Sequence, residues 1–401
     1  MTGMIPRDWR ELDLGTLAVL LDTLRIPLSS AQRAGRSGRY PYCGANGILD
    51  YINDFRIDDD VILLAEDGGN FDQYEQRSIA YRMRGKIWVN NHAHVLKAAN
   101  GETSFLFYAL EHKDIRPYIS SGTRSKLTRS ELVRIKIAMP NSREEQRCIA
   151  SSIEAVDQLI TSLERLITKK QAIKQGMMQE LLTGRTRLPG FTDQWRSVRL
   201  RDMGSTYGGL TGKDKDDFGT GSASYVTFLE VMASARLLGQ RLERVSVRPG
   251  ERQNQVQRGD ILFNGSSETP EEVALAAVVD YDPAPRTYLN SFCFGYRLAD
   301  ARVVDPLYLA YFFRSEGGRR LIASLAQGAT RYNISKTKLL ELSPSLPRLD
   351  EQRAIVGVLR TVEDEIELMD ARLQKARDIK QGMMQELLTG RTRLPVREAV
   401  G

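Results

Sequence analysis

The chain has few of the residues that build metal sites, disulfide frameworks and catalytic triads. It has three histidines and three cysteines in 401 residues. Cys43, Cys148 and Cys293 lie far apart in the sequence, which predicts neither a disulfide framework nor a zinc site. No apolar run approaches the ~20 residues that a membrane span needs, and the N-terminal residues lack the basic and apolar regions of a signal peptide. We therefore expect a soluble, cytoplasmic protein.

Nucleotide and cofactor fingerprints are also missing. Gly212 and Lys213 are followed by Asp214 instead of the Ser or Thr that ends a phosphate-binding loop. Residues 217–221, DFGTG, loosely resemble a methyltransferase cofactor loop, but no apolar strand precedes them, so we interpret them as a plain turn. The sequence thus indicates no nucleotide or S-adenosylmethionine site in this chain.

Two small polar clusters each have a catalytic and a plain interpretation. His92 and His94 alternate as two metal ligands on one side of a strand would, but no third ligand is near them in the sequence, so we favour polar strand residues. Glu268, Glu271 and Glu272 form a candidate acid/base cluster. We favour the N-terminus of a helix started by a proline, where carboxylates are stabilised. We expect no catalytic residue and no metal ligand.

What the chain does have is a long internal repeat. Residues 173–189 and 379–395 both read IKQGMMQELLTGRTRLP, and a Glu-Gln-Arg triplet precedes each copy at the same distance, at 145–147 and 351–353. A repeat of this length indicates two copies of one structural unit. We expect the function to consist of two copies of one act.

Each repeat predicts a long helix. The helices are expected to begin near Ser142, which fits a capping box with Glu145, and at Asp350, a good N-cap residue, and to end near Gly184 and Gly390. Apolar residues recur at steps of four and three, the spacing of a stripe that packs against a second helix. The stripe residues are Ile149, Ile153, Val156, Ile160, Leu163 and Ile167 in the first helix, and Ile355, Leu359, Val362, Ile366, Met369 and Leu373 in the second. The alternative is two unrelated surface helices, each packed on its own domain.

A globular stretch precedes each helix and completes the domain organisation. Short β-rich runs, helical stretches and Gly- and Ser-rich turns give both stretches a mixed α/β pattern. Both open with a Trp-Arg pair, at Trp9 and Trp195, and both close with related segments, at 122–128 and 328–335. Their middles do not align, which suggests a shared frame that holds two different recognition surfaces. The predicted domains are the recognition domains 1–141 and 192–349 and the helical domains 142–191 and 350–401.

Basic residues gather in both globular stretches, and the net charge is +6. Arginine and lysine can neutralise phosphates, and arginine and asparagine can pair with base edges. A single cluster of this kind is also compatible with a solvated surface. The candidate DNA-binding residues are Arg33, Arg36, Ser37, Arg39, Tyr40, Arg124 and Lys126 in the first stretch, and Lys213, Lys215, Arg331, Tyr332, Asn333 and Lys336 in the second.

Together these features resemble the specificity subunit of a type I restriction-modification system, over almost the whole chain. The Glu-Gln-Arg triplets and the GMMQELLTG segments, which open and close the helices, carry the resemblance best. Segments similar to that family's target recognition domains lie at 44–47, 85–95, 259–263, 266–270 and 328–335. Ser266 and Ser267, within these segments, join the candidate DNA-binding residues.

The resemblance implies an α+β multidomain fold. Two mixed α/β target recognition domains would be separated by two long helices packed as an antiparallel coiled coil, with a pseudo-two-fold internal repeat. Each domain would read one half of an asymmetric bipartite site in double-stranded DNA, and the helices would set the spacer. The chain itself would be non-catalytic and hold no cofactor or metal.

The resemblance also implies partners. Two methyltransferase subunits would dock on the helices and the adjoining surfaces of the heads, and they would supply S-adenosylmethionine binding and adenine-N6 methylation. Restriction subunits would add translocation and cleavage that use ATP and Mg. Two alternatives stay open: a non-catalytic coiled-coil scaffold that binds no DNA, and the remnant of a fused restriction-methyltransferase enzyme. Salt-sensitive DNA affinity would argue against the scaffold, and binding of S-adenosylmethionine by the isolated chain would indicate the enzyme.

Overall fold

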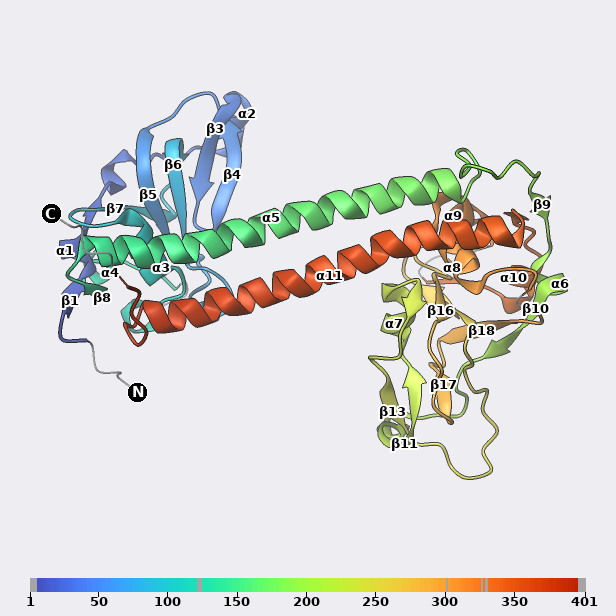
Figure 1. The fold of residues 1–401 in the computed structure, drawn as a ribbon. Coiled ribbons are helices and arrows are strands. Elements are labelled where there is room, and N and C mark those ends of the chain that lie inside the picture. Colours follow the sequence, from blue (N-terminus) through green and yellow to red (C-terminus); the bar gives the residue numbers. More distant parts are fainter. Residues whose placement is uncertain (1–5, 121–124, 301, 326, 329–330, 396–401) are drawn as a thin grey trace. The chain divides into compact units, whose positions relative to one another are not determined.

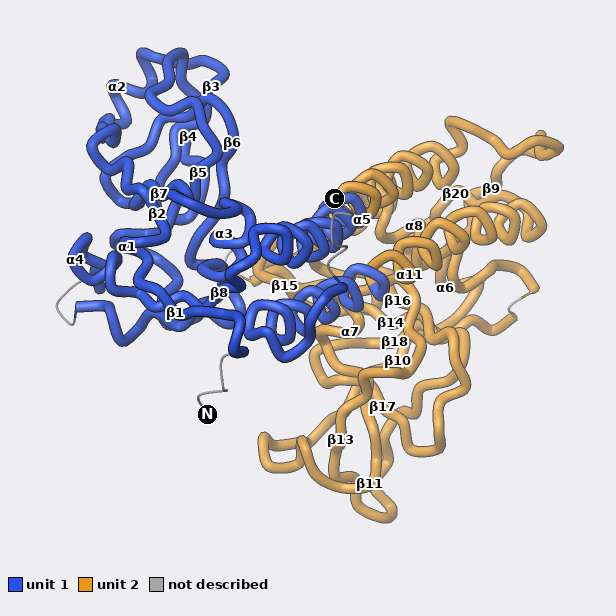
Figure 2. The backbone as a smooth tube through the Cα atoms, turned by 60° about the vertical axis from the view of Figure 1, so that its left-hand side comes forward, with its two compact units in different colours: residues 1–164, 371–401 blue, residues 165–370 orange. Residues whose placement is uncertain are grey.

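A computed structural model of the chain describes residues 6–120, 125–300, 302–325, 327–328 and 331–395. The chain divides into two compact units (Figure 2). The second unit, residues 165–370, is continuous in sequence, whereas the first is made of the two flanking segments, residues 1–164 and 371–401. Each unit contains parts of both long helices and a globular part, which we call its head.

The head of the first unit is built on a six-stranded sheet with the order β2-β7-β5-β6-β3-β4. β5 runs antiparallel to β6 and β7, and β3 runs parallel to β6, with Tyr42 opposite Trp88. The apolar run of β5 is buried on both faces: Ile62 and Leu64 pack in the core that includes α3, and Val61 and Leu63 lie in a second core on the opposite face. The elements are β1 (Trp9–Asp13), α1 (Leu14–Leu17), β2 (Ala18–Leu20), α2 (Ser30–Ala34), β3 (Ser37–Gly44), β4 (Gly47–Ile52), β5 (Ile57–Ala65), β6 (Ala80–Val89), β7 (Ala93–Ala98), α3 (Thr103–Glu111), α4 (Arg129–Leu132) and β8 (Lys136–Pro140).

The head of the second unit has a five-stranded sheet with the order β10-β18-β14-β16-β12 and a three-stranded sheet with the order β13-β11-β17. A short ladder also joins β15 to β19. The elements are β9 (Arg196–Ser197), α6 (Leu200–Met203), β10 (Gly204–Gly208), β11 (Phe218–Val226), α7 (Phe228–Ala233), β12 (Arg236–Leu237), β13 (Glu243–Val245), β14 (Ile261–Asn264), β15 (Ser266–Ser267), β16 (Ala276–Val279), β17 (Thr287–Leu289), β18 (Cys293–Leu298), α8 (Pro306–Arg314), α9 (Glu316–Ala323), β19 (Tyr332–Asn333), α10 (Lys336–Leu340) and β20 (Ser345–Leu346).

The two heads share a strand plan although their middle sequences do not align. In the second head β14 runs antiparallel to β18, as β5 does to β7 in the first. A parallel strand pair follows in each head: Tyr225 lies opposite Tyr288 in β11 and β17, as Tyr42 lies opposite Trp88 in β3 and β6. The antiparallel strand pairs β3–β4 and β11–β13 therefore occupy corresponding places in the two heads, although only β3–β4 is a hairpin, since α7 and β12 separate β11 from β13.

Within each unit, the segments of the long helices α5 (Arg143–Leu181) and α11 (Leu349–Leu387) lie side by side and run antiparallel (Figure 1). In the first unit the early part of α5 lies beside the late part of α11, with an ion pair of 2.7 Å between Glu164 and Arg377. In the second unit the late part of α5 lies beside the early part of α11, and Lys170 pairs with Glu365. The fold is thus the α+β, two-headed, helix-paired architecture implied by the resemblance.

The helix ends follow the expected chemistry with two differences. Ser142 caps α5, and its hydroxyl accepts a hydrogen bond from the Glu145 amide at 3.4 Å, but the Glu145 carboxylate, expected to complete a capping box, is bound by Arg393 instead. Asp350, expected as the N-cap of α11, instead lies inside the first turn and accepts a hydrogen bond from the Glu351 amide. A carboxylate is stabilised at either place because the helix dipole is positive there.

All twelve stripe residues are buried or half-buried, but they do not all serve the helix pair alone. Ile149 and Ile153 belong to the core of the first head, together with Leu387 from the end of α11. Ile355 and Leu359 correspondingly belong to the core of the second head, together with Leu181 from the end of α5. Each head is therefore completed by the start of one long helix and the end of the other. Among the described residues, no helix is long and apolar enough to cross a membrane.

Candidate nucleic-acid interface

The identical repeats form a matching clasp in each unit. Arg393, from the end of the second repeat, donates a 2.8 Å hydrogen bond to Glu145 at the start of α5. In the other unit Arg187 donates one of 2.7 Å to Glu351 at the start of α11. Both glutamates are buried, and a second donor from each guanidinium makes the contacts bidentate. These contacts explain why the Glu-Gln-Arg and GRTRLP segments recur together.

The glutamine of each triplet fastens the helix to its head. The Gln146 side chain donates to the Pro140 carbonyl at 2.9 Å and accepts from the Glu102 amide just before α3. Gln352 donates to the Pro347 carbonyl at 2.9 Å and accepts from the Asp305 amide just before α8. A buried glutamine with both ends bonded fixes the register between helix and head.

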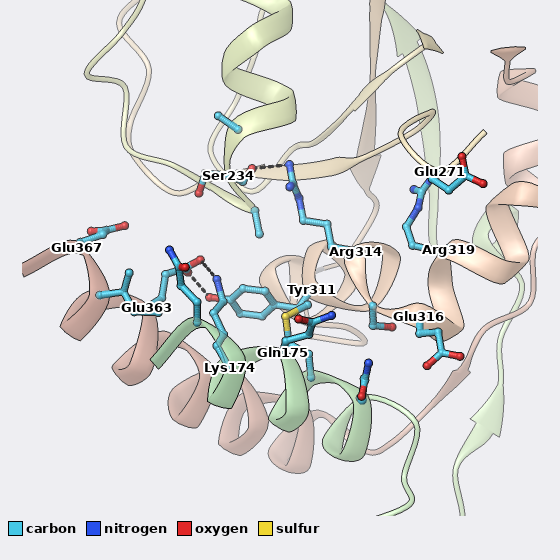
Figure 3. Close-up of a pocket in the computed structure, with 17 residues that line it drawn as sticks. Lys174, Gln175, Ser234, Glu271, Tyr311, Arg314, Glu316, Arg319, Glu363 and Glu367 are labelled. Atoms are coloured by element: carbon cyan, nitrogen blue, oxygen red, sulfur yellow. Dashed lines mark hydrogen bonds and ion pairs between the residues drawn. The ribbon is translucent and has the colours of Figure 1, made fainter. Parts of the chain in front are cut away.

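A third matched contact joins the middle of each helix pair to its head. In the second unit Tyr311 of α8 donates a 2.5 Å hydrogen bond to Glu363, which also pairs with Lys174 (Figure 3). In the first unit Tyr108 of α3 donates to Asp157 at 2.9 Å, and Lys380 pairs with the same carboxylate. Burial, with help from the adjacent carboxylates, raises the pKa of both tyrosines, so the phenols stay protonated donors.

Next to this contact each unit has a pocket lined by the same repeat residues. The pocket of the second unit is about 680 Å³ and is bordered by Lys174, Gln175, Met178 and Gln179 (Figure 3). The pocket of the first unit is about 690 Å³, and its border includes the corresponding residues 380, 381, 384 and 385. The helix side of the two pockets is therefore chemically the same, while the head side differs.

In the first head a patch of cations and aromatic rings, the hairpin patch, surrounds β3. Arg36 and Arg56 lie over the Trp88 ring at 5.7 and 5.2 Å from its centroid, and Lys86 lies 4.5 Å from the centroid of Phe55. Arg39 lies over Tyr40 at 5.0 Å and donates to its hydroxyl. The structure brings the predicted residues Arg36, Ser37, Arg39 and Tyr40 together here. In the part of the chain that the structure describes, the cations Arg36, Arg39, Arg56 and Lys86 have no carboxylate partner.

Arg33, the other predicted residue of this region, is half-buried and already bound. It pairs with Asp50 at 3.1 Å and donates to the Leu28 carbonyl, so it holds α2 against the hairpin. Sequence reasoning missed Arg56 and Lys86, which join the hairpin patch from the loop before β5 and from β6. The available signal was that each lies within two residues of an aromatic ring, Phe55 or Trp88. The contacts in the fold are crossed, because Arg56 lies over Trp88 and Lys86 beside Phe55.

The closing segment of the first head packs on the end of β5. Lys126 pairs with Glu66 at 2.9 Å, and the Leu127 amide donates to the Glu66 carbonyl. Arg124 lies outside the described residues. In this head the predicted residues thus fall into two places, the hairpin patch and the closing segment.

In the second head the closing segment and the end of β14 meet. Ser266 pairs with Asn333, and Ser267 with Tyr332, in the β15–β19 ladder. Arg331 lies 5.6 Å from the centroid of Phe292, an exposed ring that the sequence reasoning missed. A hollow of about 440 Å³ beside it is bordered by Phe292, Lys336 and glycines of the β10 end. Both serines are buried, whereas Arg331, Asn333 and Lys336 are exposed.

Lys213 and Lys215 lie apart from this group, in the loop before β11. Lys213 is almost fully buried and pairs with Glu251 at 2.8 Å, so its charge is neutralised within the chain. The hydrogen bond from Lys213 holds the pKa of Glu251 down at about 2, with help from Gln253. Lys215 is exposed at the start of the turn that leads into β11.

The polar clusters of the sequence have structural roles. His94 is buried on β7, with Nδ1 at 2.7 Å from Asp22 and Nε2 at 2.9 Å from the Leu127 carbonyl. His92 lies in the turn before β7, with Nδ1 at 2.7 Å from Asp67. Among the described residues no group of three His, Cys, Asp or Glu side chains is placed to hold a metal ion.

Two local expectations were wrong. No helix begins at Pro270: residues 270–274 form a turn, in which Glu272 accepts from Ser267 and from which Arg319 binds the backbone carbonyls. Residues 218–221 are not a plain turn but the irregular start of β11, where Gly219 and Gly221 have φ values of 80° and 85°. Backbone pairing with β13 decides this place, and the local sequence does not reveal it.

Comparisons with known proteins agree with this architecture. Residues 6–175 and 192–377 match the family described as "Type I restriction modification DNA specificity domain", one copy for each head and its helix. The type I restriction enzyme MjaVIII specificity subunit of Methanocaldococcus jannaschii is 22% identical over 97% of this chain and 94% of its own length. A proposed type I specificity subunit of Haemophilus influenzae is 34% identical, over one third (33%) of each chain.

Solved structures show the same fold. The S subunit of a type I restriction-modification system from M. genitalium superposes with a TM-score of 0.64 at 12% identity, over 96% of this chain and 97% of its own. A chain from a structural study of assembly and conformational transition of the type I system gives 0.53 at 15% identity, over 97% and 100%. The doubled family match, the paired helices and the two heads lead to one conclusion: the chain belongs to the family of type I restriction-modification DNA specificity subunits.

Proposed function

We propose that each head of this chain reads one half of an asymmetric, bipartite site in double-stranded DNA. The observation that carries this proposal is the combination of matching anchors and differing surfaces. The clasps, the glutamine bonds and the tyrosine contacts are the same in both units, whereas the exposed cations and rings of the heads differ. Identical contacts between helices and heads, combined with different exposed surfaces on the two heads, suit a protein that reads two different short sequences. The chain directs the chemistry of its partners and is itself non-catalytic.

The DNA-facing surface that we propose has two parts in the first head, the hairpin patch and the closing segment, and consists of the closing segment and Lys215 in the second head. The hairpin patch supplies free cations that neutralise phosphates, and the closing segment supplies polar and basic side chains that reach base edges. The proposed DNA-facing residues of the first head are Arg36, Ser37, Arg39, Tyr40, Arg56, Lys86, Arg124 and Lys126. Those of the second head are Lys215, Arg331, Tyr332, Asn333 and Lys336. Arg33, Lys213, Ser266 and Ser267 support these surfaces from within.

The partners that we propose are two methyltransferase subunits, one on each copy of the repeat. Ile173 and Ile379 are large apolar residues on the outer face of the helices, and both are about half exposed. Packing within the chain does not explain why such exposed positions are identical in both copies, whereas two copies of one docking surface do. The partners would supply S-adenosylmethionine and the methyl transfer, and restriction subunits would add ATP and Mg.

We also propose the domain limits 1–141, 142–191, 192–349 and 350–401, and a spacer set by helix length. Both α5 and α11 have residues in both units, so a change in helix length alters the connection between the heads without altering either head. We expect matched insertions in both helices to change the number of unread base pairs only.

Co-expression with the methyltransferase encoded beside this chain tests the proposal. Modified adenines are then mapped across the host genome. Methylation at one bipartite motif supports specificity by two heads. A stable complex that methylates no motif, or methylation at a continuous motif, contradicts the two-head reading. Replacing residues 1–141 by another head is the matched control, because it should change one half-site and leave the other.

A further inference from the structure

We infer that residues 92 and 292 are corresponding specificity-determining residues, each contacting one base pair of its half-site. The inference rests on the proposed function and names the readers within it. It starts from a turn that both heads build in the same way, immediately before β7 in the first head and β18 in the second. The residue at the tip of this turn is histidine in one head and phenylalanine in the other.

The backbone of the turn is fixed by the same bonds in both heads. The side chain of Asn90 accepts a 2.8 Å hydrogen bond from the His92 amide, and Asn290 accepts one of 2.9 Å from the Phe292 amide. The backbone amide of each asparagine donates a hydrogen bond of 3.0 Å to the end of a neighbouring strand. The acceptor is the Cys43 carbonyl of β3 in the first head and the Val226 carbonyl of β11 in the second. Asparagine side chains stabilise turns in this way.

The carbonyl of the tip residue is bound as well. It accepts from the Glu66 amide at 2.8 Å in the first head and from the Gly265 amide at 2.7 Å in the second. These donors stand at the ends of β5 and β14, where the closing segments also attach. The turn is thus a rigid mount held by two strands, and a side chain at its tip is aimed with little conformational freedom.

The tip side chains are exposed, although the strands that follow them are buried. The His92 side chain is 47% exposed and Phe292 is 59% exposed. Each stands beside the closing segment of its head: Arg331 lies over the Phe292 ring, and Lys126 forms a backbone bridge with Asp67, the residue that binds His92. Rigid mounts of the same design that carry different exposed side chains beside basic residues are what two half-site readers require.

The chemistry of the two tips predicts what each reads. Asp67 binds Nδ1 of His92, which in the neutral ring places the proton on Nδ1 and leaves Nε2 as an acceptor. Such an acceptor matches the exocyclic amino group that adenine or cytosine presents in the major groove. Phe292 has no hydrogen-bonding group and instead matches the methyl group of thymine. The adjacent Arg331 is placed to hold the nearby phosphate or base edge.

The test exchanges the tips in the full chain with its methyltransferase partner. The variants are His92→Phe and Phe292→His, and their readout is the methylated motif across the genome. We expect His92→Phe to change the preferred base at one position of the first half-site and to leave the second half-site intact. Phe292→His should do the reverse. Val19→Phe and Leu229→His, exposed apolar positions away from the tips, should leave the motif unchanged.

A second readout covers variants that no longer methylate. The purified complex of each variant is used to select bound sequences from random double-stranded DNA, which reveals a changed preference even where methylation has stopped. Selection of the wild-type motif by both tip variants, at wild-type strength, overturns the inference. A loss of binding with no change in base preference also overturns it, because it assigns the tips to affinity. If the unaltered chain itself selects no bipartite motif, the proposed function fails first.

Discussion

The guanidinium of Arg187 donates two hydrogen bonds to the carboxylate of Glu351, whose side chain is 1% exposed. Arg187 lies near the end of the first copy of the repeat, and Glu351 lies in the first turn of α11. A carboxylate this deeply buried is stable only while its charge is paired. The buried glutamate in the first turn of α11 therefore depends on an arginine from the segment that follows α5. The Arg393–Glu145 pair repeats this arrangement in the first unit.

Removing the arginine should expose that dependence. We expect Arg187→Ala to lower the free energy of unfolding of the second unit by about 3 kcal/mol, the lower end of the range for breaking a buried ion pair. Chemical denaturation followed by circular dichroism measures the change. Arg185→Ala, which removes an exposed arginine two residues away, is the matched control. Equal stability of the two variants would show that the clasp is not structural.

The hairpin patch predicts a specific salt dependence. Replacing Arg36, Arg56 and Lys86 by alanine should weaken binding to any DNA and reduce the slope of log K against log salt by about 0.9 for each phosphate that is no longer neutralised. Alanine at Arg116, Arg134 and Lys136 removes the same charge from exposed positions that already have acidic partners. If this control set changes the slope as much, net charge and not the patch governs affinity.

The exposed isoleucines of the repeat predict partner stoichiometry. Ile173→Asp or Ile379→Asp places a charge where we propose that a methyltransferase subunit packs. Each single variant should bind one subunit instead of two, and the double variant none, as measured by mass photometry or light scattering. Stability should stay unchanged because both positions are solvent-exposed in the isolated chain. Leu229→Asp controls for a new charge on an exposed apolar position. Binding of two subunits by the double variant would contradict the docking proposal.

Two glycines of the second repeat should respond oppositely to alanine. Gly390 has a φ of 69°, and an added Cβ would lie 2.6 Å from Pro6, so Gly390→Ala should destabilise the first unit by at least ~1 kcal/mol. Gly382 lies inside α11 with no atom within 4 Å of the added Cβ, so Gly382→Ala should stabilise the helix by ~0.8 kcal/mol. Thermal unfolding of the isolated chain checks both signs, and a matching sign for the two would refute the assignment.

The buried Asp22 predicts acid sensitivity of the first head. Burial alone would raise the pKa of Asp22, but hydrogen bonds from His94 and the Val95 amide, and the nearby Arg25, outweigh it, so the net pKa is lowered. A lowered pKa contributes stability above the ordinary value near 3.9, and this stability is lost as the pH falls through the folded-state pKa. Asp22→Asn should therefore reduce stability at neutral pH and show a smaller further loss on acidification below about pH 4. Parallel pH profiles for the variant and the unaltered chain would contradict this role.

The sequence predicted the parts of this protein that depend on repetition and periodicity. The paired helices followed from the steps of four and three, and the frame followed from the repeated triplets and tails. It could not predict that Ile149 and Ile355 would also belong to the cores of the heads. A stripe pattern indicates that a position is buried, but it does not indicate which element the side chain packs against. It also missed Phe292 and Lys86, whose importance depends on neighbours brought in from distant strands. The sequence predicted Lys213 as a DNA-binding residue, but in the fold its charge is paired with Glu251.

The division of the first unit into two flanking segments has a consequence for synthesis. The core of the first head includes Leu387, and its clasp needs Arg393, so this head stays incomplete until residue 393 has left the ribosome. The second unit is one uninterrupted segment and has all its parts earlier. A message cut short before residue 371 would thus yield a chain that has one finished head and one open one.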